Sequence, residues 1–151
     1  MKSLKLITIL LSLIGILNSC SSSNDDSPGS CAIVCEYAIT SSETPGTAAT
    51  SIEGTYNLTM HFPDAASPYP EGTKATFTLL DNVLTVEVDG QECITIKNPR
   101  LTTAGSTEIQ FRDTCRDNIS YDVSMTQTGD LNEINISSTT DNKWLGQFND
   151  R

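Results

Sequence analysis

The sequence has little positive charge and few residues that carry acid–base or metal chemistry. Nine Lys and Arg stand against nineteen Asp and Glu, which gives a formal charge of −10, and His61 is the one histidine. Nucleic acids and anionic membranes are bound through Lys and Arg, so this balance disfavours both as partners. No Ser, Cys or Asp motif stands near His61 that would suit it to act as a general base. We therefore expect His61 to be an exposed histidine on a strand. These absences predict a protein that is not an enzyme and holds no cofactor.

Long apolar runs and dense charge are also absent. The apolar run at residues 6–17 is shorter than the roughly 20 residues that cross a bilayer. Only 19% of the residues are charged, which is too few for a disordered acidic tail. The chain does contain many Val, Ile and Thr residues, which favour strands. Its 151 residues therefore predict one small, acidic, β-rich domain.

The first twenty residues have the pattern of an export signal. Lys2 and Lys5 precede the apolar run, and residues 17–20 read Leu-Asn-Ser-Cys. This ending resembles the lipobox of bacterial lipoproteins. The resemblance implies a signal peptide at residues 1–19, cleavage after Ser19, and acyl chains on Cys20 that anchor the protein in a lipid bilayer. An ordinary secretory signal with an incidental cysteine is the alternative.

Residues 20–30 are polar and rich in serine, which predicts a lipidated flexible tether between membrane and domain. The Asp25-Asp26 pair shortly after Cys20 resembles the acidic export signals of some Gram-negative surface lipoproteins. That resemblance implies an outer-membrane protein that faces the cell surface. A periplasm-facing position, with a linker that is merely acidic, is the alternative.

Four further cysteines, Cys31, Cys35, Cys93 and Cys115, predict two disulfides in an exported chain. A zinc site is disfavoured because Cys93 and Cys115 lie 22 residues apart and do not form a second close pair. We favour the pairs Cys31–Cys35 and Cys93–Cys115, and crossed links between the N-terminal segment, residues 31–51, and the sheet stay open. The charged loop at residues 112–118 lacks the distal Glu of a calcium loop, so we expect local Asp–Arg pairing there.

Residues 52–62 alternate apolar and polar side chains, which is typical of a strand with one buried face. The apolar series includes Phe62, and the same pattern recurs seven times up to residue 148, which predicts eight strands within a domain of residues 52–151. Turn signals stand at residues 89–90, 105–106, 129–130 and 141–142. At the first of these, a loop over residues 89–91 would pair Val86 with Ile94 and Leu84 with Ile96. Residues 63–73 carry three prolines and predict a long first loop.

Short connections predict an all-β, eight-stranded antiparallel meander, and an up-and-down barrel is favoured over a two-sheet sandwich. Gly54-Thr55-Tyr56 at the start of the first strand, the long first connection, and Trp144 and Arg151 near the end resemble lipocalin-like (calycin) β-barrels. The resemblance covers about two thirds of the chain. It implies a cup for a small apolar ligand beneath the proline-rich loop.

Aromatic side chains are the candidate ligand contacts. Five lie on the inner face of the predicted strands, and Tyr69 stands between two prolines in the first loop, where we expect it to be exposed; the five are Tyr56, Phe77, Phe111, Tyr121 and Trp144. The predicted function is a lipid-anchored outer-membrane lipoprotein whose β domain binds a small apolar ligand or a lipid. The alternative is a surface module that binds a protein or a glycan and uses the same rings as a filled core.

Overall fold

The computed structural model describes residues 31–140 and 143–151, and this part of the chain is all-β. The predicted signal peptide, the tether, Cys20 and the turn at residues 141–142 lie outside the described residues. The elements are β1 (Ile33–Glu36), η1 (Thr50–Ile52), β2 (Gly54–Met60), β3 (Lys74–Leu80), β4 (Val83–Val88), β5 (Ile94–Lys97), β6 (Arg100–Leu101), β7 (Ile109–Asp113), β8 (Ile119–Met125), β9 (Leu131–Ser138) and β10 (Leu145–Asn149). No helical segment among them is long and apolar enough to cross a membrane.

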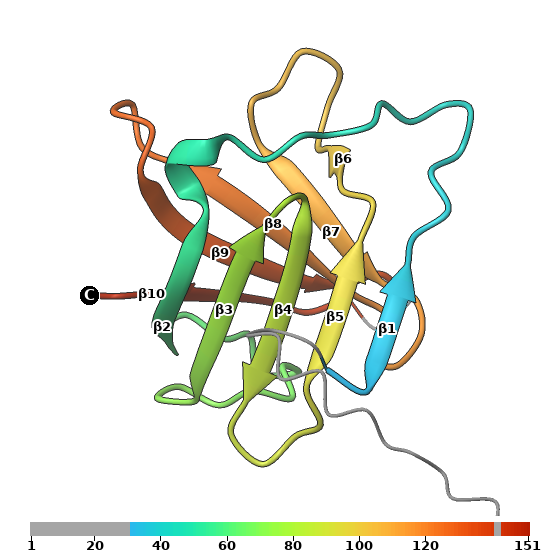
Figure 1. The fold of residues 1–151 in the computed structure, drawn as a ribbon. Helices are drawn as coiled ribbons and strands as arrows, with labels where there is room; N and C mark the ends of the chain where they lie inside the picture. Colours follow the sequence, from blue (N-terminus) through green and yellow to red (C-terminus); the bar gives the residue numbers. More distant parts are fainter. Residues whose placement is uncertain (1–30, 141–142) are drawn as a thin grey trace, which may run out of the picture.

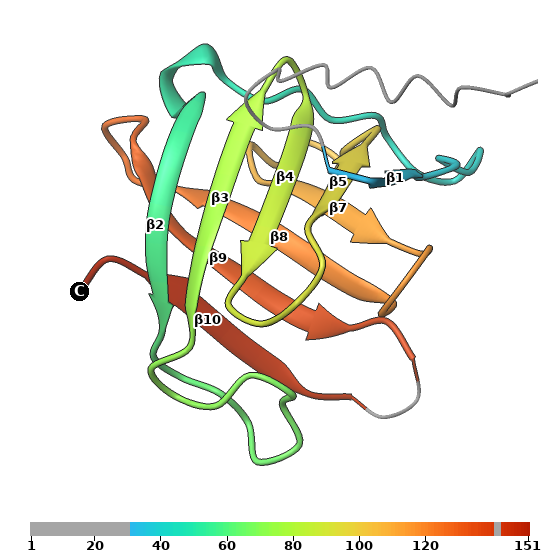
Figure 2. The ribbon, with the colours of Figure 1, turned by 60° about the horizontal axis from the view of Figure 1, so that its bottom comes forward.

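All ten strands belong to one curled sheet, in the spatial order β1-β5-β4-β3-β2-β10-β9-β8-β7-β6 (Figure 1). Strands β2 to β5 form one antiparallel run and β7 to β10 form another, and the two runs join where β2 pairs with β10. Figure 2 shows the two runs facing each other across the interior. The apolar residues of the alternating strands fill the space between them, as in Leu58 and Met60 of β2 and Phe77 and Leu79 of β3.

The local pairings agree with the sequence pattern. Val86 lies opposite Ile94 and Leu84 lies opposite Ile96, as predicted. Gly90 in the connecting loop has a φ of 80°, a left-handed conformation that glycine adopts without steric cost. The turn predicted at residues 105–106 connects β6 to β7, and the turn at residues 129–130 connects β8 to β9.

The prediction of eight antiparallel strands is wrong, because the sheet has ten strands and is mixed. Strand β1 runs parallel to β5, with Ile33 opposite Ile94, and a four-residue strand is too short to show a clear period in the sequence. Asn98, with a φ of 61°, and Pro99 interrupt the strand that follows residue 93, so β5 ends and the two-residue β6 begins. The outermost strands β1 and β6 are not paired with each other in the described chain. The curled sheet therefore stays open and has the form of a half-barrel.

The four cysteines form two disulfides, but the favoured pairing is wrong. Cys31 bonds Cys93 and Cys35 bonds Cys115, with Cα–Cα distances of 5.3 and 5.7 Å. Residues four apart in an extended chain lie about 13 Å apart, beyond disulfide reach, and β1 extends the chain from Ile33 past Cys35, which carries Cys35 away from Cys31. The parallel position of β1 beside β5 brings Cys31 to Cys93 instead. The crossed links therefore attach the N-terminal segment to the sheet at two places.

Candidate functional site

Five of the six predicted ligand contacts are buried in one core, and Tyr56 is half-buried at the margin of this core. Phe77 is at the centre, with its ring centroid 5.2 Å from Phe148 and 6.3 Å from Tyr121, both in edge-on geometry. Phe111 is fully buried in the same core, and Trp144 is buried at its edge. Centroid distances of this size are those of directly packed aromatic rings. Several of the side chains that would line a ligand cup therefore pack against one another.

Tyr69 is buried, and the prediction that it is exposed is wrong. Only 2% of the residue is accessible, and its ring packs at 6.0 Å against Trp144 and at 6.2 Å against Phe148. Its hydroxyl donates to Oε1 of Gln91 at 3.3 Å, and Ser67 Oγ bonds both its N–H and its carbonyl oxygen. The loop at residues 63–73 therefore places an aromatic ring into the core between its prolines. The partners of Tyr69 come from segments far away in the sequence, so no local pattern could show its burial.

Tyr56 is half-buried and lines a surface hollow of about 310 Å³. Its hydroxyl donates to the carbonyl oxygen of Ile52 at 2.9 Å, which fixes the ring against the start of β2. Burial, together with the charge of Asp130, raises the pKa of the Tyr56 phenol above its ordinary value of 10. The hollow lies between β2 and β9, beyond the end of β10, and its lining consists of Thr55, Tyr56, Asn57, Leu58, Leu131, Asn132 and Asp150.

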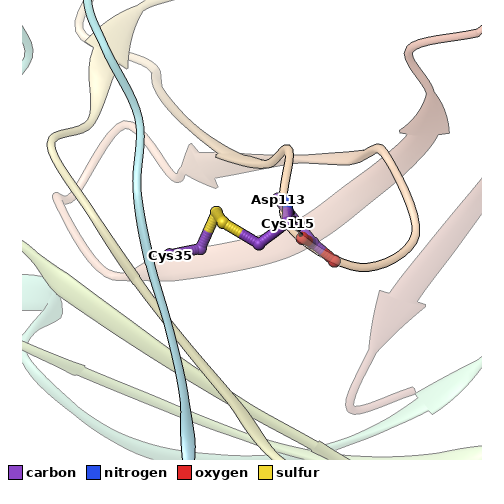
Figure 3. A group of neighbouring side chains, drawn as sticks. All are labelled: Cys35, Asp113 and Cys115. Carbon is purple, nitrogen blue, oxygen red and sulfur yellow. Dashed lines mark hydrogen bonds between the residues drawn. A yellow bond between two sulfur atoms is a disulfide. The ribbon is translucent and has the colours of Figure 1, made fainter.

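Cys35, Asp113 and Cys115 bring two sulfurs and a carboxylate within 4.8 Å of one another (Figure 3). The two sulfurs are bonded to each other, so neither is a thiolate that could ligate a metal ion. Asp113 is fully buried, and its Oδ1 accepts the N–H groups of Cys115 and Arg116, both at 2.9 Å. The cluster therefore shapes the turn between β7 and β8. The predicted Asp–Arg pairing is confirmed by Arg116, whose Nε lies 2.5 Å from Asp117.

A second surface hollow, of about 370 Å³, is lined by Phe62, Asn135, Leu145, Gly146 and Gln147. Phe62 is 67% exposed and Leu145 is 61% exposed, so two large apolar side chains meet water here. The expectation that Phe62 faces inward is wrong, because β2 ends at Met60 and the chain then turns into the loop. His61 was expected to be exposed, but the structure shows it half-buried. Its Nε2 is enclosed and has no hydrogen-bond partner in the described structure.

Glu43 is the centre of a charged cluster that no sequence motif predicts. Its carboxylate lies 3.3 Å from Arg100 and 3.6 Å from Arg112, and it accepts the Tyr37 hydroxyl at 2.9 Å. The N–H of Thr40 is the largest of the influences that lower the pKa of Glu43 from 4.5 to about 2. The cluster fastens the segment after β1 onto β6 and β7. Its members are 57 or more residues apart across the two sides, and sequence spacing does not show such a contact.

Comparison with protein-family models, with curated proteins and with solved structures finds no match to this chain.

Proposed function

We propose that this chain is a lipid-anchored outer-membrane lipoprotein whose β domain acts as a surface interaction module. The lipobox-like residues 17–20 support the anchor at Cys20, and the acidic pair Asp25-Asp26 supports a position facing the cell surface. Two disulfides in a domain of this size are typical of an oxidising compartment outside the cytoplasm, which agrees with export.

The observation that carries the interaction module is the filled interior. Tyr69, Phe148, Phe77 and Tyr121 form a continuous series of ring contacts between 5.2 and 6.3 Å, and it runs from the first loop to β8. A small apolar ligand inside the sheet would have to separate these rings and displace the loop. Filled cores give up their internal contacts only at a cost of several kcal/mol. The two antiparallel runs, joined where β2 pairs with β10, are compatible with the lipocalin resemblance. The proposed module differs from that resemblance because it has no ligand cup.

One observation favours the runner-up function, a carrier of a small, mostly apolar ligand. The hydroxyl of Tyr121 is buried and has no hydrogen-bond partner in the described structure. A ligand with one polar atom near Tyr121 would satisfy it. Unpaired buried hydroxyls are uncommon because they lose their bonds to water.

Native mass spectrometry of the mature protein, purified gently from its own cell envelope, separates the two functions. For the interaction module we expect the bare mass of the acylated chain, two hydrogens lighter for each of the two disulfides. A small molecule that leaves on denaturation would overturn the filled-core module and would identify the class of ligand.

The exposed pair Phe62 and Leu145 is the first surface to alter once a partner is known. Replacing both by Ser removes apolar area without touching the core, because both side chains are mostly exposed. Leu80→Ser is the matched control, since Leu80 is 53% exposed and lies on β3.

A further inference from the structure

The hollow beside Phe62 lies on the outer face of the sheet, over β9 and β10, and has a volume of about 370 Å³. In these two strands Ile134 and Phe148 are buried in the core, so the alternation of side chains turns Asn135 and Gln147 to the outer face. Asn135 lies directly opposite Gln147 in the register of the strands. The hollow therefore brings two amide side chains together with an exposed aromatic ring.

Three hydrogen bonds hold the backbone on either side of Phe62 against β10. The N–H of His61 donates to the carbonyl oxygen of Gln147 at 2.9 Å, and the N–H of Asp64 donates to the carbonyl oxygen of Leu145 at 2.8 Å. Asp64 Oδ2 accepts the N–H of Leu145 at 2.9 Å. The ring of Phe62 therefore meets water from a backbone that is already fixed, which lowers the entropy that a ligand loses by ordering it.

The amides of the hollow belong to a chain of hydrogen bonds. Asn149 Nδ2 donates to Gln147 Oε1 at 3.2 Å, Gln147 Nε2 to Asn135 Oδ1 at 3.3 Å, and Asn135 Nδ2 to Glu133 Oε1 at 3.1 Å. An amide group has two N–H donors and two acceptor positions on its oxygen. Asn135 and Gln147 are only partly buried, and this chain leaves each of them one donor and one acceptor. Both amides are therefore oriented and still able to bond a ligand.

The lining matches the two kinds of surface on a sugar. Sugar rings have faces of C–H groups, and the negative face of an aromatic ring such as Phe62 attracts these hydrogens. Their edges carry hydroxyl groups, each of which is both donor and acceptor. An amide with one free donor and one free acceptor can bond two neighbouring hydroxyls. The hollow therefore offers a partner to the apolar face and to the polar edge of the same ring.

Charge and size favour a neutral sugar over other partners. None of the five lining residues in the described chain is charged, so a charged ligand would lose water here without gaining an ion pair. The formal charge of −10 and the nearby carboxylate of Glu133 further disfavour an acidic glycan. A stable protein interface buries about 800 Å² on each partner. The apolar surface here consists of two exposed side chains, Phe62 and Leu145, which is small for such an interface.

We propose that this hollow binds a neutral glycan, with Phe62 stacked on the face of one sugar ring and the amides of Asn135 and Gln147 bonded to its hydroxyl groups. This inference rests on the proposed interaction module and names its partner class. Leu145 extends the apolar contact beside the ring of Phe62. Specificity for a particular sugar then depends on which neighbouring hydroxyls reach the two amides.

The experiment uses the full mature protein in a polyoxyethylene detergent, which has no sugar headgroup to compete for the hollow. Neutral hexasaccharides of glucose, mannose, galactose and N-acetylglucosamine are titrated separately and followed by NMR. A hexasaccharide of galacturonic acid is the charged control. We expect at least one neutral hexasaccharide to shift the side-chain amide signals of Asn135 and Gln147 and the ring signals of Phe62. The charged control should shift none of them.

Variants at Phe62 test the stacking contact. Phe62→Leu keeps an apolar side chain and removes the ring, so we expect it to weaken binding of the neutral hexasaccharide roughly threefold to tenfold. Phe62→Trp keeps an aromatic ring and should bind at least as well as the parent. Leu80→Ala is the matched control, because Leu80 is 53% exposed on β3, and it should leave binding unchanged. Phe62 is 67% exposed, so these variants should fold like the parent.

A second pair of variants tests the amide contact. Gln147→Ala removes one of the two amides, and we expect binding to weaken roughly threefold to tenfold. Gln127→Ala changes the same residue type at an exposed position in the turn between β8 and β9, and it should leave binding unchanged. If Gln147→Ala does not fold, the comparison of Phe62→Leu with Phe62→Trp decides.

Three results would overturn the glycan site. The first is no shift at Phe62, Asn135 and Gln147 with any of the neutral hexasaccharides up to about 10 mM. The second is binding that neither Phe62→Leu nor Gln147→Ala weakens, which would place the sugar elsewhere on the protein. The third is a partner protein that needs Phe62 and still binds after enzymatic removal of its glycans, which would keep the interaction module and change its partner class. A small apolar molecule in the native mass spectrum would overturn the proposed function instead, so the two failures are distinguishable.

Discussion

Tyr69, from the loop after β2, packs edge-on against Trp144, from the segment before β10, with their ring centroids 6.0 Å apart. The contact joins two segments 75 residues apart in the sequence. It makes the first loop part of the hydrophobic core. The ring of Tyr69 therefore contributes to the stability of the domain.

Replacing Tyr69 by Ala should lower the free energy of unfolding by about 3–5 kcal/mol, as for other large core side chains. Tyr69→Phe keeps the ring contacts and loses only the hydroxyl bond to Gln91, so we expect a loss of about 1 kcal/mol. Urea unfolding followed by Trp144 fluorescence measures both. Equal stability of the Ala variant and the parent would show that the loop is not docked in solution.

Tyr121→Phe should leave the stability unchanged or raise it by up to about 1 kcal/mol at pH 7, because the hydroxyl it removes has no partner. Burial raises the pKa of Tyr121 well above 10, so the unfolded chain releases this proton first as the pH rises. The parent therefore keeps its full stability below pH 10 and loses part of it as the pH rises above 10, because ionisation of Tyr121 favours the unfolded chain. Urea unfolding at pH 7 and pH 11 should show a smaller alkaline loss in the variant than in the parent. A clear loss at pH 7 would mean that the hydroxyl is bonded in solution.

Alternation of side chains was enough to predict the segments of β2 to β5 and of β7 to β10, but not β1 or β6. The register of Val86 with Ile94 also followed from the sequence, because a shift of one residue would turn apolar side chains outward. These features depend on neighbours within about twenty residues. The all-β class of the fold could be predicted from the sequence for the same reason.

Contacts between distant segments could not be predicted from the sequence. The parallel pairing of β1 with β5 leaves no periodic trace in four residues, and without it the partner of Cys31 could not be identified. The burial of Tyr69 depends on Trp144 and Phe148, which arrive from the other end of the chain.

Glu43→Gln should destabilise the protein at neutral pH, because the carboxylate contacts Arg100, Arg112 and Tyr37. The pKa of Glu43 is about 2 in the folded protein against an ordinary value of 4.5. Its stabilisation is therefore complete above pH 4.5 and is lost as the pH falls through 2. Thermal unfolding should show a difference between variant and parent at pH 7 that shrinks toward pH 2. Glu87→Gln, at an exposed position on β4, is the control and should leave the stability at pH 7 unchanged.

Removal of either disulfide should destabilise the domain by about 2–5 kcal/mol. The bonds close long loops, with sequence separations of 62 residues for Cys31–Cys93 and 80 for Cys35–Cys115. Both hold β1, so the double variants Cys31→Ser/Cys93→Ser and Cys35→Ser/Cys115→Ser should each speed amide exchange in β1 and β5 more than in β8 and β9. Peptide mapping under non-reducing conditions checks the pairing directly. A Cys31–Cys35 fragment in that map would contradict the crossed links.

Cys20→Ala tests the membrane anchor separately from the domain. Without the thiol no acyl chain can be attached, so we expect a precursor that keeps residues 1–19, takes up no labelled fatty acid and loses its lipid anchor. The domain should still fold, because Cys20 is not one of the four cysteines in the two disulfides. Ser19→Thr or another conservative change is a weaker test, since it alters cleavage alone. Labelling with a fatty-acid analogue, together with non-reducing gel mobility, measures lipidation and folding in the same sample. A variant that is labelled like the parent would show that the lipobox resemblance is misleading, and the surface position inferred from Asp25-Asp26 would lose its basis with it.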